Sequence, residues 1–443
     1  MSRSGDTAME QSMNEPVRVG VVGMGTVGSG VVRVLGRSAD HIGRQAGRPI
    51  VVEQVVVRDI GKARSVSVPG DRISTSLADI SENPAITVAA MLVGGLEPAR
   101  TMTIELLRKG KDVVTANKAL LAEHGPELFA VAREAGRSIA FEAAVAGGIP
   151  IVAAIAECLA ANRIESIRGI LNGTSNFILT RMEEDGSDYA EVLALAQAEG
   201  YAEADPAMDV DGTDATQKLA LLAHLAFGVW VPWAEIPRVG LETIDQELLR
   251  FADELGYRIR VVADASRADG SLSMRVGPTL VRKGTPLAET RGAFNAVSVV
   301  GDAVGPMFFH GLGAGQLPTA SAVVADIIDT VVGRAAITFR TTGMLDAESP
   351  ASQLSGGDSN RYLLRLQVTD RPGVLADLTG LLGREGISIA SVIQHQAAAG
   401  SAAVPLVIMT HVCEAAAISR AVAALDGHAA VQATASCLPV LDV

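Results

Sequence analysis

The side chains best suited to acid–base chemistry are concentrated in one short stretch, EGYAEADPAMDVDGTDATQKL, at Glu199–Leu219. Its ionisable side chains after Tyr201 are Glu203, Asp205, Asp209, Asp211, Asp214 and Lys218. If the stretch ends in a helix, Asp214 and Lys218 are four residues apart and share one face of it. A carboxylate beside an ammonium group can orient that ammonium, or a bound water, for proton transfer. The stretch therefore indicates a site for acid–base chemistry.

Turn and helix signals predict the elements that position these side chains. The dipeptides Asp-Pro and Asp-Gly at 205–206 and 211–212 are turn signals, so the first part is expected to be a loop. From Thr213 onward leucines recur at helical spacing, and Thr213 or Asp214 can cap the helix start. A solvated acidic loop is an alternative interpretation. Half of a calcium loop is another, although the full oxygen ligand series and the closing glutamate are missing.

A second lysine lies just after a predicted strand. The sequence DVVTANK at 112–118 predicts a short strand that ends near Thr115, with Lys118 following it. Ligands of open α/β sheets bind outside the carboxyl ends of the strands. A lysine in such a place is most often a surface residue, but this one falls beside the expected cofactor crevice. We therefore expect Thr115 and Lys118 to face the cofactor.

A glycine-rich turn near the N-terminus has the context of a dinucleotide-binding fingerprint. A β-branched run at Val17–Val22 precedes it, and apolar residues at helical spacing follow. The first glycine allows the tight turn, the second lets the backbone approach a pyrophosphate, and the third lets the helix pack on the strand. The helix start offers free N–H groups to the phosphates. The expected cofactor contacts here are Gly23, Gly25, Thr26, Val27 and Gly28.

The end of the second predicted strand, Ile50–Val57, bears on the choice of cofactor. Sites that prefer NAD place an acidic side chain there to hold the ribose 2′-hydroxyl. In this chain Arg58 comes first, and further basic side chains follow within a few residues. A cation at this position suits a 2′-phosphate, so we expect NADP, with NAD as the alternative. A solvated charged loop would also explain these residues.

Three further polar or glycine-rich turns precede predicted helices. In FEAAVAGGIP at 141–150, the Glu142 carboxylate and loop carbonyls could hold a hard cation, or the loop could simply lead into a long helix. LNGTSN at 171–176 could recognise an anion or an amide, or be a simple capped turn. GLGAGQLP leads into a helix expected at Ala322–Val332, and its Gly315 could face phosphates or substrate.

Composition argues against several classes of protein. The 443 residues carry a net charge of −13 and only 3% aromatics, which disfavours binding nucleic acid through phosphates or base stacking. Three widely spaced cysteines form neither a disulfide framework nor a zinc pattern, which suits a reducing cytoplasm. No apolar run is long enough to span a membrane. Residues 1–15 are polar and are expected to form a disordered tail.

The C-terminal part predicts a separate small domain. Residues 346–360 are small and polar, with several Gly and Ser, and are expected to be a linker. Beyond it the order is strand, helix, strand, strand, helix, strand, with the last strand expected at Ala430–Cys437. This is the βαββαβ order of ferredoxin-like folds.

Five motifs occur in an order and at spacings that resemble the homoserine dehydrogenases. They are GMGTVG, TANKALLA, FEAAVAGGIP, LNGTSNFIL and GYAEADPAMDVDGTDATQKLALLA. The resemblance runs from Val17 to Val443, and the motifs together are far more specific than any one alone. The C-terminal part is similar to ACT domains, which bind amino acids, and DRPGVLA is their usual opening turn. Since no aspartokinase segment precedes the first motif, we expect the monofunctional type.

The resemblance implies a fold class and domain boundaries. The class is α/β, with a Rossmann-type dinucleotide-binding domain, an α+β substrate and dimerisation domain, and a ferredoxin-like ACT domain. The implied ranges are 16–142 with 313–345 for the first domain, 143–312 for the second and 361–443 for the third. Ala202, Ala204 and Leu312 depart from residues common in the family, which puts the rigidity of the substrate loop in doubt.

The resemblance also implies a reaction and residue roles. The family interconverts L-homoserine and L-aspartate 4-semialdehyde with NAD(P), a step in threonine, methionine and isoleucine biosynthesis. Lys218 is expected to donate the proton to the aldehyde oxygen, with Lys118 facing the same oxygen and Asp214 orienting Lys218. The implied substrate contacts are Glu203, Asp209, Gly173 and Thr174. The implied ligands of a monovalent cation such as Na⁺ are Glu142, Val145, Gly147 and Ile149.

Regulation and assembly are further expectations from the resemblance. An amino acid, expected to be threonine, would regulate the enzyme through the ACT domain, and the enzyme would be a homodimer or homotetramer in the cytoplasm. Two alternatives remain: another lysine-dependent Rossmann aldehyde or alcohol dehydrogenase, and a non-catalytic amino-acid sensor.

Overall fold

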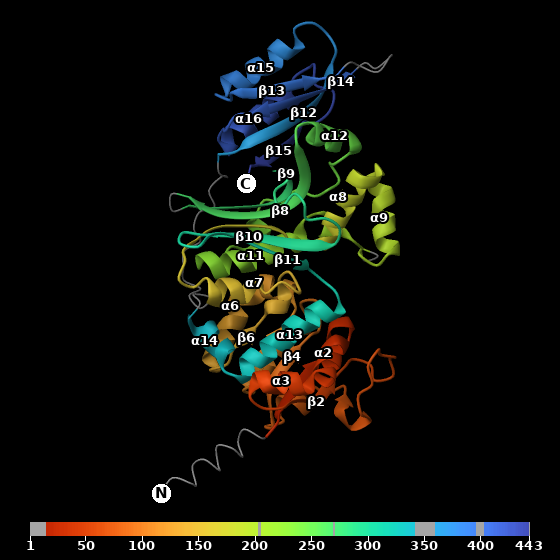
Figure 1. Cartoon of the computed structure of the whole chain (residues 1–443), viewed down its shortest axis with the longest axis vertical. Coiled ribbons are helices and arrows are strands. Elements are labelled where there is room, and N and C mark those ends of the chain that lie inside the picture. The colour runs from red at the N-terminus through yellow and green to blue at the C-terminus, as the bar shows by residue number, and fades with distance from the viewer. Residues whose placement is uncertain (1–14, 203–204, 269–270, 342–358, 396–402, 443) are drawn as a thin grey trace.

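The computed structural model describes the chain except for residues 1–14, 203–204, 269–270, 342–358, 396–402 and 443. The tail predicted at 1–15 and the linker predicted at 346–360 lie almost wholly outside the described residues. The described elements stack along one long axis, with a first sheet near one end and the C-terminal domain at the other (Figure 1). None of the helices that the described residues form is long and apolar enough to cross a membrane.

The first sheet has six parallel strands in the order β3-β2-β1-β4-β5-β6. They are β1 (Val17–Val22), β2 (Ile50–Val56), β3 (Ile73–Ser74), β4 (Ile86–Met91), β5 (Asp112–Thr115) and β6 (Ile139–Ala140). The accompanying helices are α2 (Thr26–Arg37), α3 (Ala39–Ala46), α4 (Ala78–Ser81), α5 (Ala99–Arg108), α6 (Lys118–Glu134), α13 (Gln316–Val331) and α14 (Arg334–Thr341). The strand order reverses between β1 and β4, where ligands of such sheets bind. The predicted Rossmann-type fold is confirmed.

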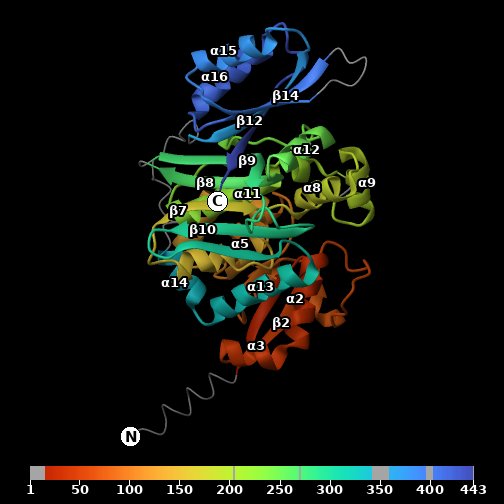
Figure 2. The ribbon, with the colours of Figure 1, turned by 45° about the horizontal axis from the view of Figure 1, so that its top comes forward.

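α13 brings the chain back to this first sheet. It lies along α2 in Figures 1 and 2, and Gly30 permits the close approach, because a Cβ there would lie 2.8 Å from the backbone oxygen of Gln316. The helix was expected at Ala322–Val332, but it begins directly after Gly315. Pro318 falls in its first turn, where a backbone N–H is not needed, so the proline does not prevent the earlier start.

The second sheet has nine strands in the order β11-β10-β7-β8-β9-β15-β12-β14-β13. Five come from the middle of the chain: β7 (Ile164–Ile170), β8 (Tyr257–Ala268), β9 (Ser271–Arg282), β10 (Phe294–Gly301) and β11 (Gly305–Leu312). Four come from the C-terminal domain: β12 (Arg361–Thr369), β13 (Ile389–Gln394), β14 (Ala403–Thr410) and β15 (Ser436–Leu441). Val440 and Leu441 of β15 pair in parallel with Leu280 and Val281 of β9. One continuous sheet therefore runs through both domains.

Eight α-helices and several short turns complete this half of the molecule. The helices are α7 (Ile151–Ala153), α8 (Gly173–Asp185), α9 (Tyr189–Ala198), α10 (Ala207–Val210), α11 (Thr213–Phe227), α12 (Gln246–Glu254), α15 (Val374–Arg384) and α16 (Ala415–Asp426). The 3₁₀ and π turns among the described residues are η1 (Gly70–Arg72), η2 (Glu142–Ala144), η3 (Ala154–Cys158) and η4 (Trp233–Glu235).

The C-terminal domain has the predicted βαββαβ order. One face of its sheet packs with α15 and α16 in a core that includes Leu364 and Leu366. Side chains of the opposite face, among them Leu363 and Val440, belong to the same apolar cluster as the preceding domain. The domain is therefore attached to the rest of the chain by one sheet face as well as by the β15 edge.

The last strand lies later than the predicted Ala430–Cys437. Val431 forms only an isolated bridge to β12. The carboxylate of Asp426 then accepts a hydrogen bond from the backbone N–H of Ala435 at 2.7 Å, which holds the chain in a turn. Regular pairing starts only at Ser436.

The long helix expected after Pro150 is also shorter than predicted. α7 continues as one π-helical turn and ends at Cys158. The side chain of Asn162 donates to the backbone oxygen of Leu159 and accepts from the backbone N–H of Val304. These two bonds turn the chain toward the β10–β11 connection and end the helix.

Candidate active site

Asp214 joins two lysines that come from different helices. Lys218, one turn later on α11, donates from Nζ to Asp214 Oδ2 at 2.8 Å. Lys118, the first residue of α6, places its Nζ 3.0 Å from the other oxygen, Asp214 Oδ1. Lys218 also donates to the backbone oxygen of Leu171 at 2.7 Å. The predicted pairing of Asp214 with Lys218 is confirmed, and the structure brings Lys118 to the same carboxylate.

This pairing decides the protonation of Asp214. Its side chain is only 8% exposed, and burial alone would raise the pKa of the carboxyl group. The charges of Lys218 and Lys118 and the hydrogen bonds to the carboxylate outweigh burial and hold the pKa of Asp214 well below its usual range. The carboxylate therefore stays ionised at any ordinary pH and holds both ammonium groups in place.

The start of α11 differs from the prediction in one detail. The helix begins at Thr213 as expected, but neither Thr213 nor Asp214 is its cap. Gly212 occupies the N-cap position with φ of 87°, and the Asp211 carboxylate accepts from the backbone N–H of Thr213 at 2.7 Å. The Asp214 carboxylate bonds to the lysines instead.

Asn172 connects two acidic residues of the site. Its Nδ2 donates to Asp209 Oδ1 at 2.8 Å and to Asp214 Oδ2 at 2.9 Å. Its Oδ1 accepts from the backbone N–H of Ser175 at 2.8 Å and so caps α8. Burial raises the pKa of Asp209, and the bond from Asn172 opposes this increase. The sequence predicted a polar turn here without singling out Asn172, although an asparagine between a strand and a helix is a good N-cap.

Gly173 and Thr174 form the first turn of α8 rather than a loop before it. The hydroxyl of Thr174 donates to the backbone oxygen of Tyr201 at 2.7 Å and so holds the start of the acidic stretch against α8. A Cβ at Gly173 would lie 2.7 Å from the backbone oxygen of Ala293, so only glycine fits without movement. Glu203, the other predicted substrate contact, lies outside the described residues.

A cleft of about 670 Å³ lies at the carboxyl ends of β1, β2 and β4. Gly23, Gly25 and Arg58 line it, together with the basic side chains of Lys62 and Arg64. Arg58 is exposed at the end of β2.

The glycines of the fingerprint have the predicted geometric roles. Gly23 has φ of 94°. A Cβ at Gly25 would meet no atom within 4 Å, so the backbone there is open to a ligand. A Cβ at Gly28 would lie 2.1 Å from the backbone oxygen of Gly23, so the helix could not pack as it does.

The remaining predicted cofactor contacts lie around the cleft without lining it. Thr26 and Val27 form the start of α2. Gly315 directly precedes Gln316, whose side chain donates to the backbone oxygen of Thr26 at 3.1 Å. The hydroxyl of Thr115 is buried and donates to the backbone oxygen of Met91, tying β5 to β4.

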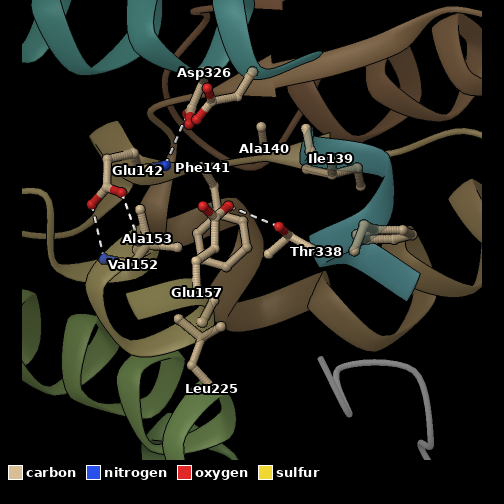
Figure 3. A pocket seen from close by; sticks show the side chains of 14 residues that line it. Ile139, Ala140, Phe141, Glu142, Val152, Ala153, Glu157, Leu225, Asp326 and Thr338 are labelled. Carbon is tan, nitrogen blue, oxygen red and sulfur yellow. Dashed lines mark hydrogen bonds between the residues drawn. The ribbon is translucent and has the colours of Figure 1, made fainter. Parts of the chain in front are cut away.

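Glu142 is held inside the protein by backbone groups (Figure 3). Its carboxylate accepts from the N–H groups of Val152 and Ala153, both at 2.8 Å, and its own N–H donates to Asp326 Oδ2 at 2.9 Å. Burial raises the pKa of Glu142 to about 7, against the effect of the two backbone hydrogen bonds. These residues line a small cavity of about 50 Å³, which also includes Glu157.

The loop after Glu142 has an irregular backbone. Ala146 and Gly147 have φ of 54° and 52°. Among the described residues, no backbone or side-chain donor bonds to the carbonyl oxygens of Val145 and Gly147, although both residues are buried. Ile149 is buried beside them. No group of three or more His, Cys, Asp and Glu side chains among the described residues could hold a metal ion. Any cation in this loop would therefore depend on carbonyl oxygens.

Known families match most of the chain. Residues 23–142 match "Homoserine dehydrogenase, NAD binding domain", residues 150–328 match "Homoserine dehydrogenase", and residues 362–429 match "ACT domain". The homoserine dehydrogenase of Pseudomonas aeruginosa is 43% identical over 421 residues, which cover 93% of this chain and 96% of that protein. The chain belongs to the homoserine dehydrogenase family.

Solved homoserine dehydrogenases share the fold. The crystal structure of the enzyme from Thiobacillus denitrificans has a TM-score of 0.90 and 41% identity, and covers 97% of this chain and 99% of its own. A hyperthermophilic archaeal homoserine dehydrogenase mutant in complex with NADPH has a TM-score of 0.60 and 26% identity, and covers 71% of this chain and 97% of its own. The paired lysines and the dinucleotide cleft described above are therefore parts of a homoserine dehydrogenase.

The ACT domain of this homoserine dehydrogenase chain has its own cavity, of about 370 Å³. Its lining includes the opening turn from Asp370 to Leu375, the end of β12 at Thr369, and Gln394 of β13. An ACT domain is thus present with a cavity at the turn that the sequence singled out.

Proposed function

We propose that Lys218 is the proton donor when this family member reduces L-aspartate 4-semialdehyde to L-homoserine. The observation that carries the proposal is the shared carboxylate of Asp214, which fixes two ammonium groups beside each other. A bound nicotinamide cofactor supplies the hydride chemistry at the aldehyde carbon. As charge develops on the aldehyde oxygen, Lys218 donates a proton to it and Lys118 stabilises it electrostatically. In the reverse direction Lys218 takes the proton from the hydroxyl group.

We assign Asp209 and Glu203 to the ammonium group of the substrate. Asp209 supports this assignment because Asn172 links it to Asp214, so a group bound at Asp209 lies close to the lysines. Gly173 and Thr174 would shape the same pocket from α8. An acidic contact explains why a substrate with an ammonium group would be preferred over an uncharged aldehyde.

NADP is the proposed cofactor, with NAD as the alternative. Arg58, Lys62 and Arg64 surround the end of β2 within the cleft, and the archaeal relative was solved with NADPH. Replacing Arg58 with Asp should shift the ratio of kcat/KM for NADPH and NADH toward NADH by about tenfold or more, as one lost charge-assisted hydrogen bond is worth about 1.5–3 kcal/mol. An unchanged ratio would remove Arg58 from the phosphate site.

A monovalent cation such as Na⁺ would be held by the loop of Glu142, Val145, Gly147 and Ile149. The available carbonyl oxygens of Val145 and Gly147 fit a hard cation, which prefers oxygen ligands. The Glu142 carboxylate instead bonds to backbone N–H groups, so its contribution would come from its main chain. The ion would order the loop beside the first turn of α7.

Regulation by an amino acid, with threonine as the proposed effector, is assigned to the ACT cavity at Asp370–Leu375. We further propose a homodimer or homotetramer. β11 and β13 are the edge strands of the nine-stranded sheet, so each has one edge that could pair with a second copy of the chain. Three free cysteines, Cys158, Cys413 and Cys437, support a cytoplasmic location.

One assay tests these assignments together. Oxidation of NADPH and of NADH by aspartate 4-semialdehyde would be followed with and without threonine. Turnover that threonine suppresses would support the reaction, the cofactor and the effector. Turnover without suppression would overturn threonine as the effector, and no turnover with either cofactor would overturn the reaction.

A further inference from the structure

We infer that Asn172 is a positioning residue for the reaction, because its amide fixes the carboxylates of Asp209 and Asp214 relative to the start of α8. This inference rests on the proposed roles of these two aspartates. The Asn172 side chain lies at the junction of β7 and α8, and the residue is only 5% exposed. Few groups compete for its hydrogen bonds in such a place.

The orientation of the amide follows from its three partners. Oδ1 accepts from the N–H of Ser175, while Nδ2 donates to one oxygen of Asp209 and to one of Asp214. In the flipped orientation, Oδ1 would face two carboxylates and Nδ2 would face an N–H donor. All three contacts would then be repulsive, so the observed orientation is the only one that satisfies the site.

The neighbouring residue holds the other half of the catalytic pair. The backbone oxygen of Leu171 accepts from Lys218 Nζ at 2.7 Å and from Asn295 Nδ2 at 3.0 Å. Asn295 is fully buried. Two consecutive residues thus hold Lys218 and its partner Asp214, so the β7–α8 junction positions the acid–base pair as a unit.

The amide also reduces repulsion between two carboxylates. Asp209 faces Asp214 and Lys218 of α11, Lys118 of α6, and Asn172. Asp214 disfavours ionisation of Asp209, whereas the lysines and the Asn172 amide favour it. Without the amide, Asp209 would be free to rotate away from Asp214 and to take up a proton more readily. The substrate's ammonium group would then lose its anionic partner.

Three variants separate positioning from helix capping. Serine and aspartate both cap helices about as well as asparagine, whereas alanine does not. Asn172→Ser keeps a cap acceptor but cannot reach both carboxylates. Asn172→Asp keeps the cap and places a third carboxylate against the other two. Asn172→Ala loses both the cap and the two donated bonds, so its difference from Asn172→Ser measures the loss of the cap.

A positioning role predicts the following result. Asn172→Ser should keep the melting temperature within a few degrees of wild type, while the KM for aspartate semialdehyde and the Kd for L-homoserine rise about tenfold or more, as expected for a lost charged hydrogen bond. Asn172→Asp should raise the KM for aspartate semialdehyde and the Kd for L-homoserine further. The Kd for NADPH should change little in both variants. The acidic limb of the kcat/KM profile should move to higher pH in Asn172→Ser.

A capping role predicts a different pattern. Asn172→Ser would then match wild type in KM, Kd and pH profile, and Asn172→Ala would lose stability; this result would overturn the inference. Wild-type turnover is measured in the same series, so a failure of the proposed reaction appears in the wild type and not in the variants. L-Homoserine binding by calorimetry provides the readout that does not depend on turnover.

Discussion

The carboxylate of Asp214 shows how one residue can order a site. It accepts from Lys218 and Asn172 on one oxygen and contacts Lys118 on the other. An ammonium group on a flexible stem has many rotamers, and a buried anion restricts them. In the proposed mechanism, the geometry around the reacting oxygen therefore depends on a residue that need not touch the substrate.

Replacing Asp214 with Asn should change the acid stability of the protein. The folded-state pKa of Asp214 lies well below its unfolded value, so its stabilisation is present above about pH 4 and is lost as pH falls below it, through the folded pKa. Wild type should be more stable than Asp214→Asn at pH 7, and the difference in melting temperature should narrow below about pH 4. Thermal melts from pH 7 to pH 3 measure this difference in melting temperature. A difference that does not change with pH would contradict the ion pairing of Asp214.

Replacing Lys218 with Ala should mainly affect chemistry. Loss of a general acid lowers kcat by about 10²–10⁴-fold, while the Kd for NADPH should stay nearly constant. Lys109→Ala is the matched control, because Lys109 is an exposed lysine that pairs only with Glu82 among the described residues. Stopped-flow turnover and fluorescence titration give the two quantities. Equal loss of both in Lys218→Ala would indicate a structural role.

The residue scale also shows what the sequence could predict. The four-residue spacing of Asp214 and Lys218 was enough to predict their contact, because both residues lie on one helix. The contacts of Lys118 and Asn172 with the same carboxylate depend on how α6 and α8 pack against α11, and no local pattern encodes that packing. Their placement at strand ends was the available signal, and it indicated a region rather than a partner.

At the scale of elements, the β1–α2 turn contains two glycines, Gly25 and Gly28, with different roles. Ala at Gly28 would place its Cβ 2.1 Å from the backbone oxygen of Gly23 and force α2 off β1. Ala at Gly25 would meet nothing within 4 Å in the protein. Gly28 is therefore needed for packing, and we expect Gly25 to be needed for binding the cofactor.

Gly28→Ala should lower both stability and cofactor affinity, with a stability loss of about 1–3 kcal/mol, as is typical of overpacking. Gly25→Ala should keep the melting temperature but raise the Kd for NADPH. Chemical denaturation and cofactor titration of the two variants test this difference. If Gly25→Ala lost stability and bound NADPH normally, the assignment of the two glycines would be reversed.

Element types were largely predictable from the sequence, and element ends were not. Strands β1, β2 and β5 and the βαββαβ order follow from apolar runs and turn residues, whereas the two-residue strand β3 carries no such signal. The ends of α7 and β15 depend instead on side-chain bonds from Asn162 and Asp426 to backbone groups. Such bonds form only after distant segments have met, so local propensity could not reveal them.

At the scale of the whole molecule, α12 lies between the ACT domain and α8, the helix that begins directly after Asn172. Arg365 of β12 contacts Asp245, the N-cap of α12. The next residue, Gln246, donates to the backbone oxygens of Met182 and Ser187 at the far end of α8. The other end of α8 begins directly after Asn172. A displacement of β12 could thus reach the active site through two helices.

Arg365→Met should weaken the coupling between the ACT domain and the proposed active site. We expect kcat without effector to stay within about twofold of wild type, while inhibition by the ACT effector falls severalfold and effector binding persists, since coupling energies are about 1–3 kcal/mol. Arg371→Met, at the turn that lines the proposed effector cavity, is the comparison, because it should weaken effector binding itself. Inhibition curves and effector calorimetry distinguish the two; unchanged inhibition in Arg365→Met would exclude α12 as the connection.

The pairing of β15 with β9 has a consequence for biosynthesis of the protein. β15 is translated after every other element that the structure describes, yet it supplies the neighbour on the second edge of β9, whose first edge pairs with β8. While the ribosome makes the ACT domain, the edge of β9 remains open to pairing with another chain. A polypeptide interrupted before Ser436 would carry every proposed catalytic residue and still expose this edge to aggregation and proteolysis. A chain that lacks the end of its regulatory domain would therefore also lack the strand that covers this edge of β9.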